Sequence, residues 1–167
     1  MSTKHFWVDG PWPGRLAVSS RPRGGEWLAD EMSDWKRGGI DLLVSLLTPE
    51  EEESLDLSRE ATAARSEGIE FLALRIRDRE VPTSESELTA VLENMNRRLS
   101  SGKNALIHCR QGVGRTGLVA ACLLITTGLD PAIAIARVSA ARGVPVPETR
   151  EQREWVNHYA AVLANSR

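Results

Sequence analysis

Hydrophobic and polar residues alternate along this chain in a pattern that predicts strands and helices in turn. Mostly apolar runs of strand length occur at 15–20, 40–47, 69–76 and 104–109. Helical spacing or helix-start signals occur at 26–39, 48–55, 58–67, 84–102, 116–127, 130–142 and 147–166. The order of these elements predicts one α/β domain over residues 1–167, with a central, mostly parallel sheet, helices on both faces and a helical C-terminal third.

Composition narrows the class of protein. The 167 residues are 41% hydrophobic and 26% charged, which suits a globular domain with a sizeable core. A net charge of -2 gives no overall attraction to nucleic acid or to an anionic membrane. The two cysteines and the lack of an apolar secretory segment indicate a reducing compartment. We therefore expect a cytoplasmic monomer without nucleic-acid or membrane partners.

The segment IHCRQGVGRTG, residues 107–117, carries the strongest chemical signal. A strand is expected to end at Cys109 and a helix to begin near Thr116, so the residues between them must curl tightly. These residues are Arg110, Gln111, Gly112, Val113, Gly114 and Arg115. Gly112 and Gly114 permit the positive φ of such a curl, which turns successive N–H groups inward as a nest for an anion. The start of the helix adds further N–H groups and the positive end of its dipole.

A tetrahedral oxyanion in this nest would give each residue type a role. Arg115 supplies a planar fork for two oxygens, and Cys109 faces a positive field that favours the thiolate, a nucleophile. Thr116 is placed to donate its hydroxyl to the cysteine sulfur. Cys122 lies among apolar residues in the middle of a predicted helix, so we expect it to belong to the core. With three histidines and two cysteines and no metal-ligand cluster visible, we expect no metal or other cofactor.

The sequence HCRQGVGRTG resembles the signature loop of the cysteine-dependent protein tyrosine phosphatase superfamily, which has His-Cys, five residues, Arg and then Ser or Thr. Residues 15–47 resemble the first half of small dual-specificity phosphatases. IEFLALRIRDREVP resembles their general-acid loop, and ETREQREWVNHY is similar to their last helix. The resemblance implies a compact α/β domain and a phosphocysteine mechanism without a metal.

Hydrolysis of a phosphate ester also needs an acid that protonates the leaving oxygen. In the family that this sequence resembles, the acid is an aspartate on a loop upstream of the cysteine. The corresponding residue here is Asp78, in the predicted loop 77–83. Glu80 is the second candidate, whereas Asp56 and Asp130 fit this loop geometry less well. The same carboxylate would later act as base toward water. The alternative is that Asp78 only pairs with a neighbouring arginine at the surface.

Other positions have two open interpretations. His108 is expected on the face of the strand opposite Cys109, where it supports the loop rather than transferring protons. Gln152 either orients the attacking water or occupies a solvated helix position. Three arginines in RIRDRE either form a positive rim or are ordinary surface residues; these are Arg75, Arg77 and Arg79. The acidic run at 48–55 is interpreted as a solvated helix start rather than a binding element.

Four functions remain possible at this point. The first is a phosphatase acting on phosphotyrosine, and also on phosphoserine and phosphothreonine, in a phosphorylated protein or peptide. The second is a phosphoinositide or other small-molecule phosphatase, which is weakened by the neutral Val113 within the loop. The third is a non-catalytic phosphate-binding module, although cysteine, arginine and acid are all present. The fourth is a thiol-transfer enzyme, against which the upstream acid and the GVGRT segment argue.

Overall fold

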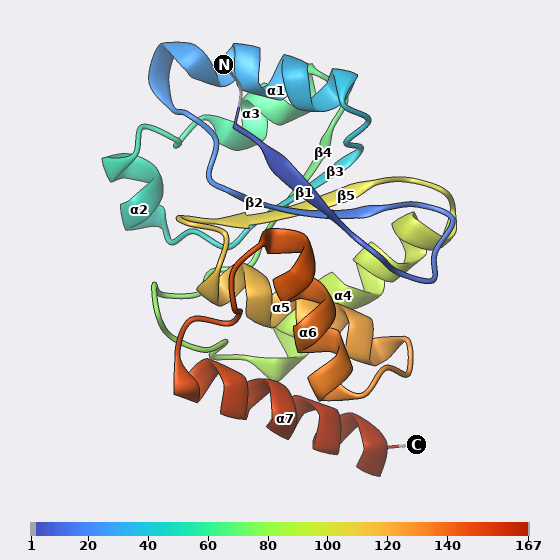
Figure 1. Cartoon of the computed structure of the whole chain (residues 1–167). Helices are drawn as coiled ribbons and strands as arrows, with labels where there is room; N and C mark the ends of the chain where they lie inside the picture. The colour runs from blue at the N-terminus through green and yellow to red at the C-terminus, as the bar shows by residue number, and fades with distance from the viewer. Residues whose placement is uncertain (1–2, 167) are drawn as a thin grey trace.

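A five-stranded sheet forms the centre of the computed structural model, which describes residues 3–166 (Figure 1). The strands are β1 (His5–Val8), β2 (Leu16–Ser20), β3 (Leu42–Ser45), β4 (Glu70–Ala73) and β5 (Ala105–Cys109). Their order is β1-β2-β5-β3-β4; β1 is antiparallel to β2 and the other pairs are parallel. The predicted mostly parallel sheet is therefore confirmed, and β5, which ends at Cys109, is its central strand.

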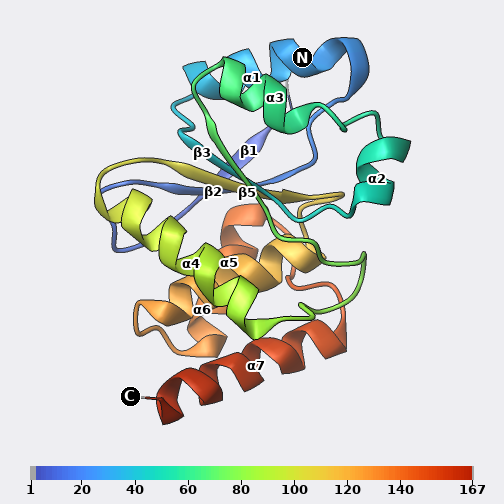
Figure 2. The same cartoon turned by 180° about the vertical axis from the view of Figure 1, so that it is seen from behind.

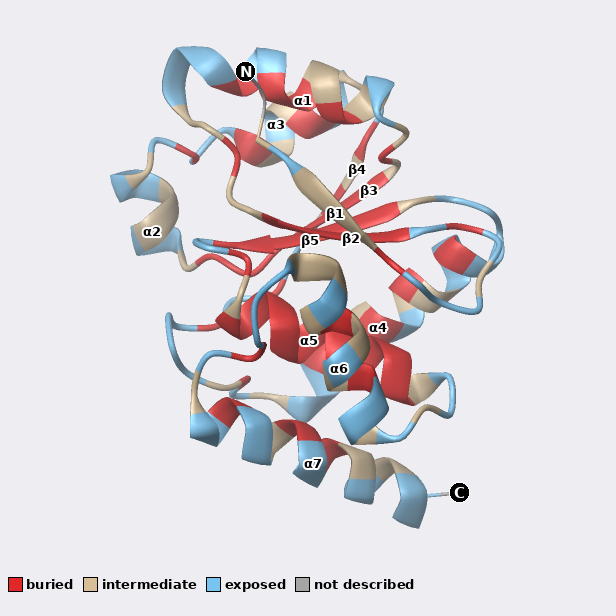
Figure 3. Ribbon diagram, viewed as in Figure 1, coloured by how far each residue is buried: buried red, intermediate tan, exposed pale blue. Residues whose placement is uncertain are grey.

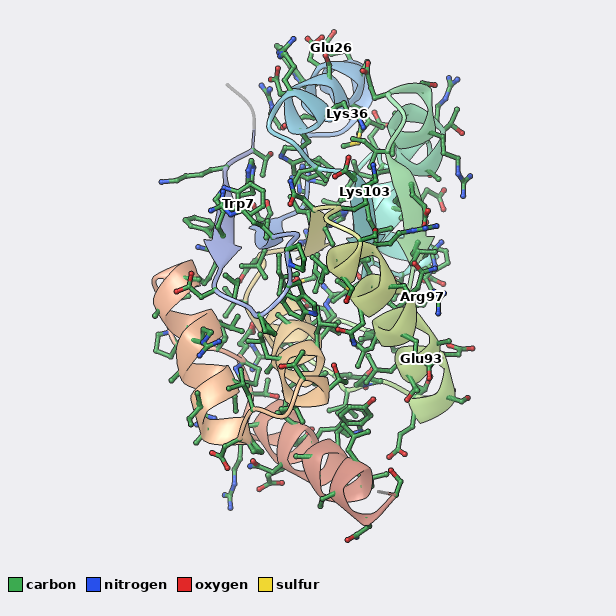
Figure 4. The ribbon with its side chains drawn as sticks, turned by 90° about the vertical axis from the view of Figure 1, so that its right-hand side faces the viewer. Trp7, Glu26, Lys36, Glu93, Arg97 and Lys103 are labelled. Atoms are coloured by element: carbon green, nitrogen blue, oxygen red, sulfur yellow. The ribbon has the colours of Figure 1, made fainter. Side chains whose placement is uncertain are left out.

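Helices cover both faces of the sheet, as expected (Figures 1 and 2). One layer holds α1 (Leu28–Arg37), which follows a short 3-10 turn (Gly25–Trp27), and α3 (Glu60–Ser66). The other layer holds α4 (Glu85–Ser100), α5 (Gly114–Thr126), α6 (Pro131–Arg142) and α7 (Arg150–Asn165). The short helix α2 (Pro49–Ser54) lies beside the end of the sheet where the parallel strands finish. Figure 4 shows the layers from the side, with Glu93 and Arg97 on the outer surface of α4 and Trp7 at the β1 edge.

Alternate residues of β5 belong to different cores. Ile107 and Cys109 face the α4–α7 layer, whereas Leu106 packs in the cluster formed with α1 and α3. Because side chains alternate along a strand, His108 faces the same side as Leu106, where it contacts Trp35 at a ring separation of 6.2 Å. The end of β5 thus presents the cysteine and the histidine to opposite faces of the sheet.

Helix α5 is buried along almost its whole length (Figure 3). It begins at Gly114, two residues before the predicted start, because the glycine and Arg115 already adopt helical backbone. A helix that is apolar on all sides belongs in the centre of a layer. Cys122 lies in its middle, and burial raises the pKa of that thiol, which therefore has a packing role.

Two strands differ from the prediction: β1 was missed, and β4 is shorter than expected. The sequence did not indicate β1, because this short edge strand is only half-buried and lacks a continuous apolar run. The predicted strand 69–76 ends as β4 at Ala73. The following residues still bond to β3 and its continuation, through Leu74 N–H to Ser45 O (2.9 Å) and Ile76 N–H to Leu46 O (3.3 Å).

Candidate active site

Cys109 ends β5 at the bottom of a tight loop formed by residues 110–115, here called the Cys109 loop. The thiol is 3% exposed, and its sulfur accepts a hydrogen bond from the Gly112 N–H at 3.3 Å. Gly112 has φ of +73°, and an added Cβ would lie 2.4 Å from the Ser19 carbonyl oxygen. The expected positive φ is therefore present at Gly112. It is absent at Gly114, which is helical; an added Cβ there would lie 3.0 Å from the Gln152 side chain, a tight contact.

The carbonyl groups of the Cys109 loop point outward to partners in other segments. The Arg110 carbonyl accepts from the Arg21 N–H at 3.3 Å. Arg142, at the end of α6, donates to the Gln111 carbonyl at 3.0 Å and to the Gly112 carbonyl at 3.2 Å. The N–H of a trans peptide points away from its carbonyl, so these bonds favour inward-facing N–H groups, as an anion nest requires. This support by Arg142 was not predicted from the sequence, because Arg142 lies 30 residues after Gly112.

The guanidinium of Arg115 is buried and held from several directions. Its Nη1 and Nη2 donate to the two Glu51 carboxylate oxygens at 2.6 and 2.9 Å. Nη1 also donates to the Ile76 carbonyl at 2.8 Å, and Nη2 donates to Asp78 Oδ1 at 3.2 Å. The buried Nε has no partner. The Nη1–Nη2 edge of the guanidinium thus binds Glu51 and Nη2 also binds Asp78, whereas Nε has no protein acceptor.

Glu51 corrects the interpretation of the acidic run. Thr48 caps α2 in a capping box with Glu51, as a helix start predicts, but the carboxylate points toward Arg115 and is 12% exposed. Burial alone would raise the pKa of Glu51. Hydrogen bonds from Arg115 and Thr48, together with the Arg115 charge, outweigh burial and keep that pKa below its ordinary value. Burial would likewise lower the pKa of Arg115, but the bond to Glu51 and nearby negative charges raise it, so the guanidinium stays charged.

The loop of residues 77–83, here called the Asp78 loop, lies next to the Cys109 loop, and its residues Asp78 and Arg79 face Cys109 and Arg115. Asp78 is 55% exposed and pairs with Arg115. The loop is fastened to the C-terminal part of the chain by the Arg79–Glu148 ion pair (2.5 Å) and by Gln152 Nε2, which donates to the Glu80 carbonyl at 3.0 Å. Although β3 separates β4 from β5, the strands are parallel and both loops leave the same edge of the sheet.

A small cavity of about 130 Å³ brings the predicted residues together. Its lining residues are Asp78, Arg79, Cys109, Gln111, Gly114, Arg115 and Glu148. Three predicted loop residues do not line it. Arg110 points into solvent, Val113 packs against the core, and the Gly112 N–H is bonded to the sulfur. The cavity thus combines a thiol, a guanidinium and a carboxyl group.

Thr116 does not make the predicted hydrogen bond to sulfur. Its hydroxyl oxygen is buried without a hydrogen-bond partner. Gln152 is also buried, where it caps α7 in a capping box with Thr149, so its interpretation as a solvated position is wrong. Its side-chain oxygen and nitrogen are both engaged by backbone groups of the loops beside the cavity.

The three arginines of RIRDRE have separate environments and do not form one rim. Arg75 donates to the Leu47 carbonyl and pairs with Glu52, both within 2.9 Å. Arg79 has a left-handed backbone with φ of +66° and faces the cavity. Arg77 is exposed and lines a wider groove of about 830 Å³ together with residues 80–83 of the Asp78 loop.

Within residues 3–166, no group of three or more His, Cys, Asp or Glu side chains is arranged to hold a metal ion. No helix in that part of the chain is long and apolar enough to cross a membrane.

Comparison with known proteins identifies the family. The model of the Swiss Army Knife protein DSP-PTPase phosphatase domain matches residues 6–159. This chain therefore belongs to the dual-specificity phosphatase branch of the protein tyrosine phosphatase family. Cyclin-dependent kinase inhibitor 3 of Rattus norvegicus is 33% identical over 76 residues, which are 44% of this chain and 36% of that protein. The match thus spans about a third of the relative's length.

Solved structures share the fold over nearly the whole chain. Kinase-associated phosphatase, with its catalytic-site cysteine replaced by serine, matches with a TM-score of 0.88 and 21% identity, covering 98% of this chain and 97% of that one. The active form of Tk-PTP matches with a TM-score of 0.78 and 28% identity, covering 94% and 96%. The fold is therefore that of small phosphatases of this family.

Proposed function

We propose that this chain is a protein phosphatase that hydrolyses phosphotyrosine, and phosphoserine and phosphothreonine esters as well, through a phosphocysteine intermediate on Cys109. One observation carries the proposal: the Cys109 thiol, the Arg115 guanidinium and the Asp78 carboxyl group border a single small cavity at the carboxyl end of β5. Ligand sites of parallel α/β sheets lie at this edge.

In this proposal the phosphoryl group is held by the inward N–H groups of the Cys109 loop and by the first turn of α5. The Nε–Nη2 edge of Arg115 binds two of its oxygens, because Glu51 occupies the other fork of the guanidinium. An incoming phosphate takes over the Nη2 donor that Asp78 accepts from in the structure. Binding of the substrate therefore frees the Asp78 carboxyl group for proton transfer.

The reaction then proceeds in two displacements. In the first, the Cys109 thiolate attacks phosphorus, the bond to the ester oxygen breaks, and protonated Asp78 gives its proton to the leaving alcohol or phenol. In the second, water attacks phosphorus, the Asp78 carboxylate takes the water's proton, and the S–P bond breaks to release inorganic phosphate and the thiolate. The Thr116 hydroxyl, buried beside the loop without a partner, is available to stabilise the departing sulfur.

A phosphorylated protein is the proposed substrate class. The names of the relatives, cyclin-dependent kinase inhibitor 3 and kinase-associated phosphatase, connect those proteins with kinases. The wider groove beside the Asp78 loop, bordered by Arg75 and Arg77, offers space for the polypeptide on either side of a phosphorylated residue. A cytoplasmic location, a monomeric state and the absence of other partners stay predictions.

The test compares Cys109→Ser with Cys122→Ser on an aryl phosphate. Serine at 109 is similar in size but provides no thiolate, so turnover should vanish, whereas the buried Cys122 should be replaceable with little change in kcat. Turnover by Cys109→Ser, with contaminating phosphatase excluded, would contradict the mechanism. A panel of phosphopeptides, inositol phosphates and nucleotides then tests the substrate class: the proposal requires phosphopeptides to have the highest kcat/KM.

A further inference from the structure

The turn that carries Asp78 has an uncommon backbone conformation. The Glu80 N–H donates to the Arg77 carbonyl oxygen at 3.0 Å, so residues 77–80 form a β-turn with Asp78 and Arg79 at its centre. Arg79 has φ of +66°, whereas φ of Asp78 is not positive, which is the combination of a type II turn. Glycine usually occupies the Arg79 position of such a turn, because a side chain there strains the backbone. An arginine at this position therefore needs contacts that hold it in place.

Two side chains, one just before α7 and one in its first turn, supply these contacts. Glu148 Oε1 accepts from Arg79 Nη1 at 2.5 Å, and Gln152 Nε2 donates to the Glu80 carbonyl oxygen at 3.0 Å. Gln152 is fully buried, and its side-chain oxygen accepts from the Glu148 and Thr149 N–H groups, both at 3.1 Å. One buried amide thus fixes the backbone of Glu148 relative to the turn, so the Glu148 carboxylate is a well-anchored partner for Arg79.

The Asp78 carboxyl group has little else to direct it. Its side chain is 55% exposed, and its hydrogen bond from Arg115 Nη2 is 3.2 Å long. In the proposed reaction the phosphoryl group takes over that donor. Within residues 3–166, no other group donates a hydrogen bond to this carboxyl group. In the substrate complex, the direction of the acid therefore depends on the turn that carries it.

We infer that Arg79 and Glu148 are positioning residues for the acid: their ion pair holds the strained turn in place, and the turn keeps the Asp78 carboxyl group directed toward the ester oxygen of the substrate. All three residues line the same cavity as Cys109. The inference deepens the proposed function, on which it rests, because it names the residues that direct the general acid. Arg79 is 65% exposed, and ion pairs this exposed contribute little to global stability. The consequence should therefore appear in one catalytic step rather than in Tm.

The decisive variant is Glu148→Gln, which keeps the size of the side chain and removes its charge. Two substrates of similar size are compared: phenyl phosphate, whose leaving group is poor, and para-nitrophenyl phosphate, whose leaving group is good. The substrate ratio, defined as kcat/KM for the first divided by kcat/KM for the second, measures how much the acid contributes. We expect this ratio to fall roughly threefold to tenfold in the variant. Both substrates present the same phosphoryl group to the cavity, so a change in phosphate binding alone cancels in the ratio.

A double-mutant comparison separates positioning of the acid from other effects. Without the Asp78 carboxyl group there is nothing to position, so Glu148→Gln added to Asp78→Ala should leave the substrate ratio as it is in Asp78→Ala alone. The matched control is Glu70→Gln. Glu70 accepts from Arg98 at 2.6 Å in a similarly exposed ion pair, but at the start of β4, at the end of the sheet away from the site. That variant should keep the native ratio, while Glu70→Gln and Glu148→Gln change Tm by similar small amounts.

The outcomes distinguish the inference from the proposed function. A native substrate ratio in Glu148→Gln would overturn the inference, and so would an equal fall of the ratio in the presence and absence of Asp78. Either result leaves the proposed function standing as long as Asp78→Ala itself lowers the ratio. If Asp78→Ala keeps the native ratio, the proposed acid is wrong, and the inference fails with it.

Discussion

Replacing Glu51 with glutamine tests whether the orientation of Arg115 depends on this helix start. The two Arg115–Glu51 bonds are 2.6 and 2.9 Å long, and both groups are largely buried. A glutamine oxygen can keep one of them, but its NH₂ then faces an N–H donor. One lost bond to a charged group corresponds to about 2 kcal/mol. For a chain of this size, that free energy lowers Tm by about 4–8 °C.

The same substitution should also lower kcat, and this loss should be easier to detect than the change in Tm. With Glu51 neutral, Arg115 pairs more strongly with Asp78 and loses its fixed direction, so kcat should fall roughly tenfold to a hundredfold. The control is Glu52→Gln, one residue further along α2. Glu52 pairs with Arg75, which is 42% exposed, and exposed pairs contribute only about 0–1 kcal/mol. Equal effects of the two substitutions on kcat and Tm would refute the reasoning.

The pH dependence of stability gives a second measure of the same contact. The pKa of Glu51 is lower in the folded protein than its ordinary value of 4.5. The folded state therefore binds fewer protons at this site than the unfolded chain, and the stabilisation is fully present above that ordinary value. It is lost as pH falls through the lower, folded-state value. The difference in unfolding free energy between native protein and Glu51→Gln should be constant near neutral pH and shrink in acid; denaturant titrations measure this.

Three further substitutions test other parts of the site. Asp78→Ala should cut kcat/KM for a phosphotyrosine peptide roughly 10²–10⁴-fold but kcat/KM for an activated aryl phosphate much less, because kcat/KM reports the first displacement and a good leaving group needs no proton there; equal losses of kcat/KM would contradict its role as acid. Arg142→Lys should weaken vanadate binding and lower kcat about tenfold, since an ammonium cannot reproduce both carbonyl bonds, whereas Arg137→Lys on the same helix should change neither value. Gly112→Ala should abolish vanadate binding, because the added methyl group clashes with the backbone of β2. Gly102 also has a positive φ but has open space around it, so Gly102→Ala should lower the free energy of unfolding by only about 1–2 kcal/mol in a denaturant titration.

Much of the fold follows from local signals in the sequence. The continuous run of apolar residues predicts the buried strand β5. The capping residues Thr48 and Ser84 predict the starts of α2 and α4. The edge strand β1 could not be predicted, because its pairing with β2 is a tertiary contact, and its three half-buried residues followed by the buried Val8 form no distinct pattern in the sequence. The order β5-β3-β4 likewise arises from how the layers pack.

The candidate site was predictable where one short segment supplies it. Cys109 and Arg115 share a loop, so spacing alone placed them together. Their supports come from distant parts of the chain: Glu51 lies 64 residues before Arg115, and Arg142 lies 30 residues after Gly112. The four consecutive glutamates at 50–53 do not indicate by their sequence which of them contacts Arg115. Such contacts depend on the assembled sheet edge.

The central claim is that Cys109 becomes covalently phosphorylated. The most direct measurement is rapid acid quenching of the enzyme during turnover of an aryl phosphate, followed by mass spectrometry of its peptides. The account predicts phosphate on Cys109 in the native protein and no phosphorylated peptide from the Cys109→Ser variant. The amount on Cys109 should rise when loss of Asp78 slows hydrolysis of the intermediate. Turnover without any phosphorylated peptide, or with phosphate on a residue other than Cys109, would contradict it.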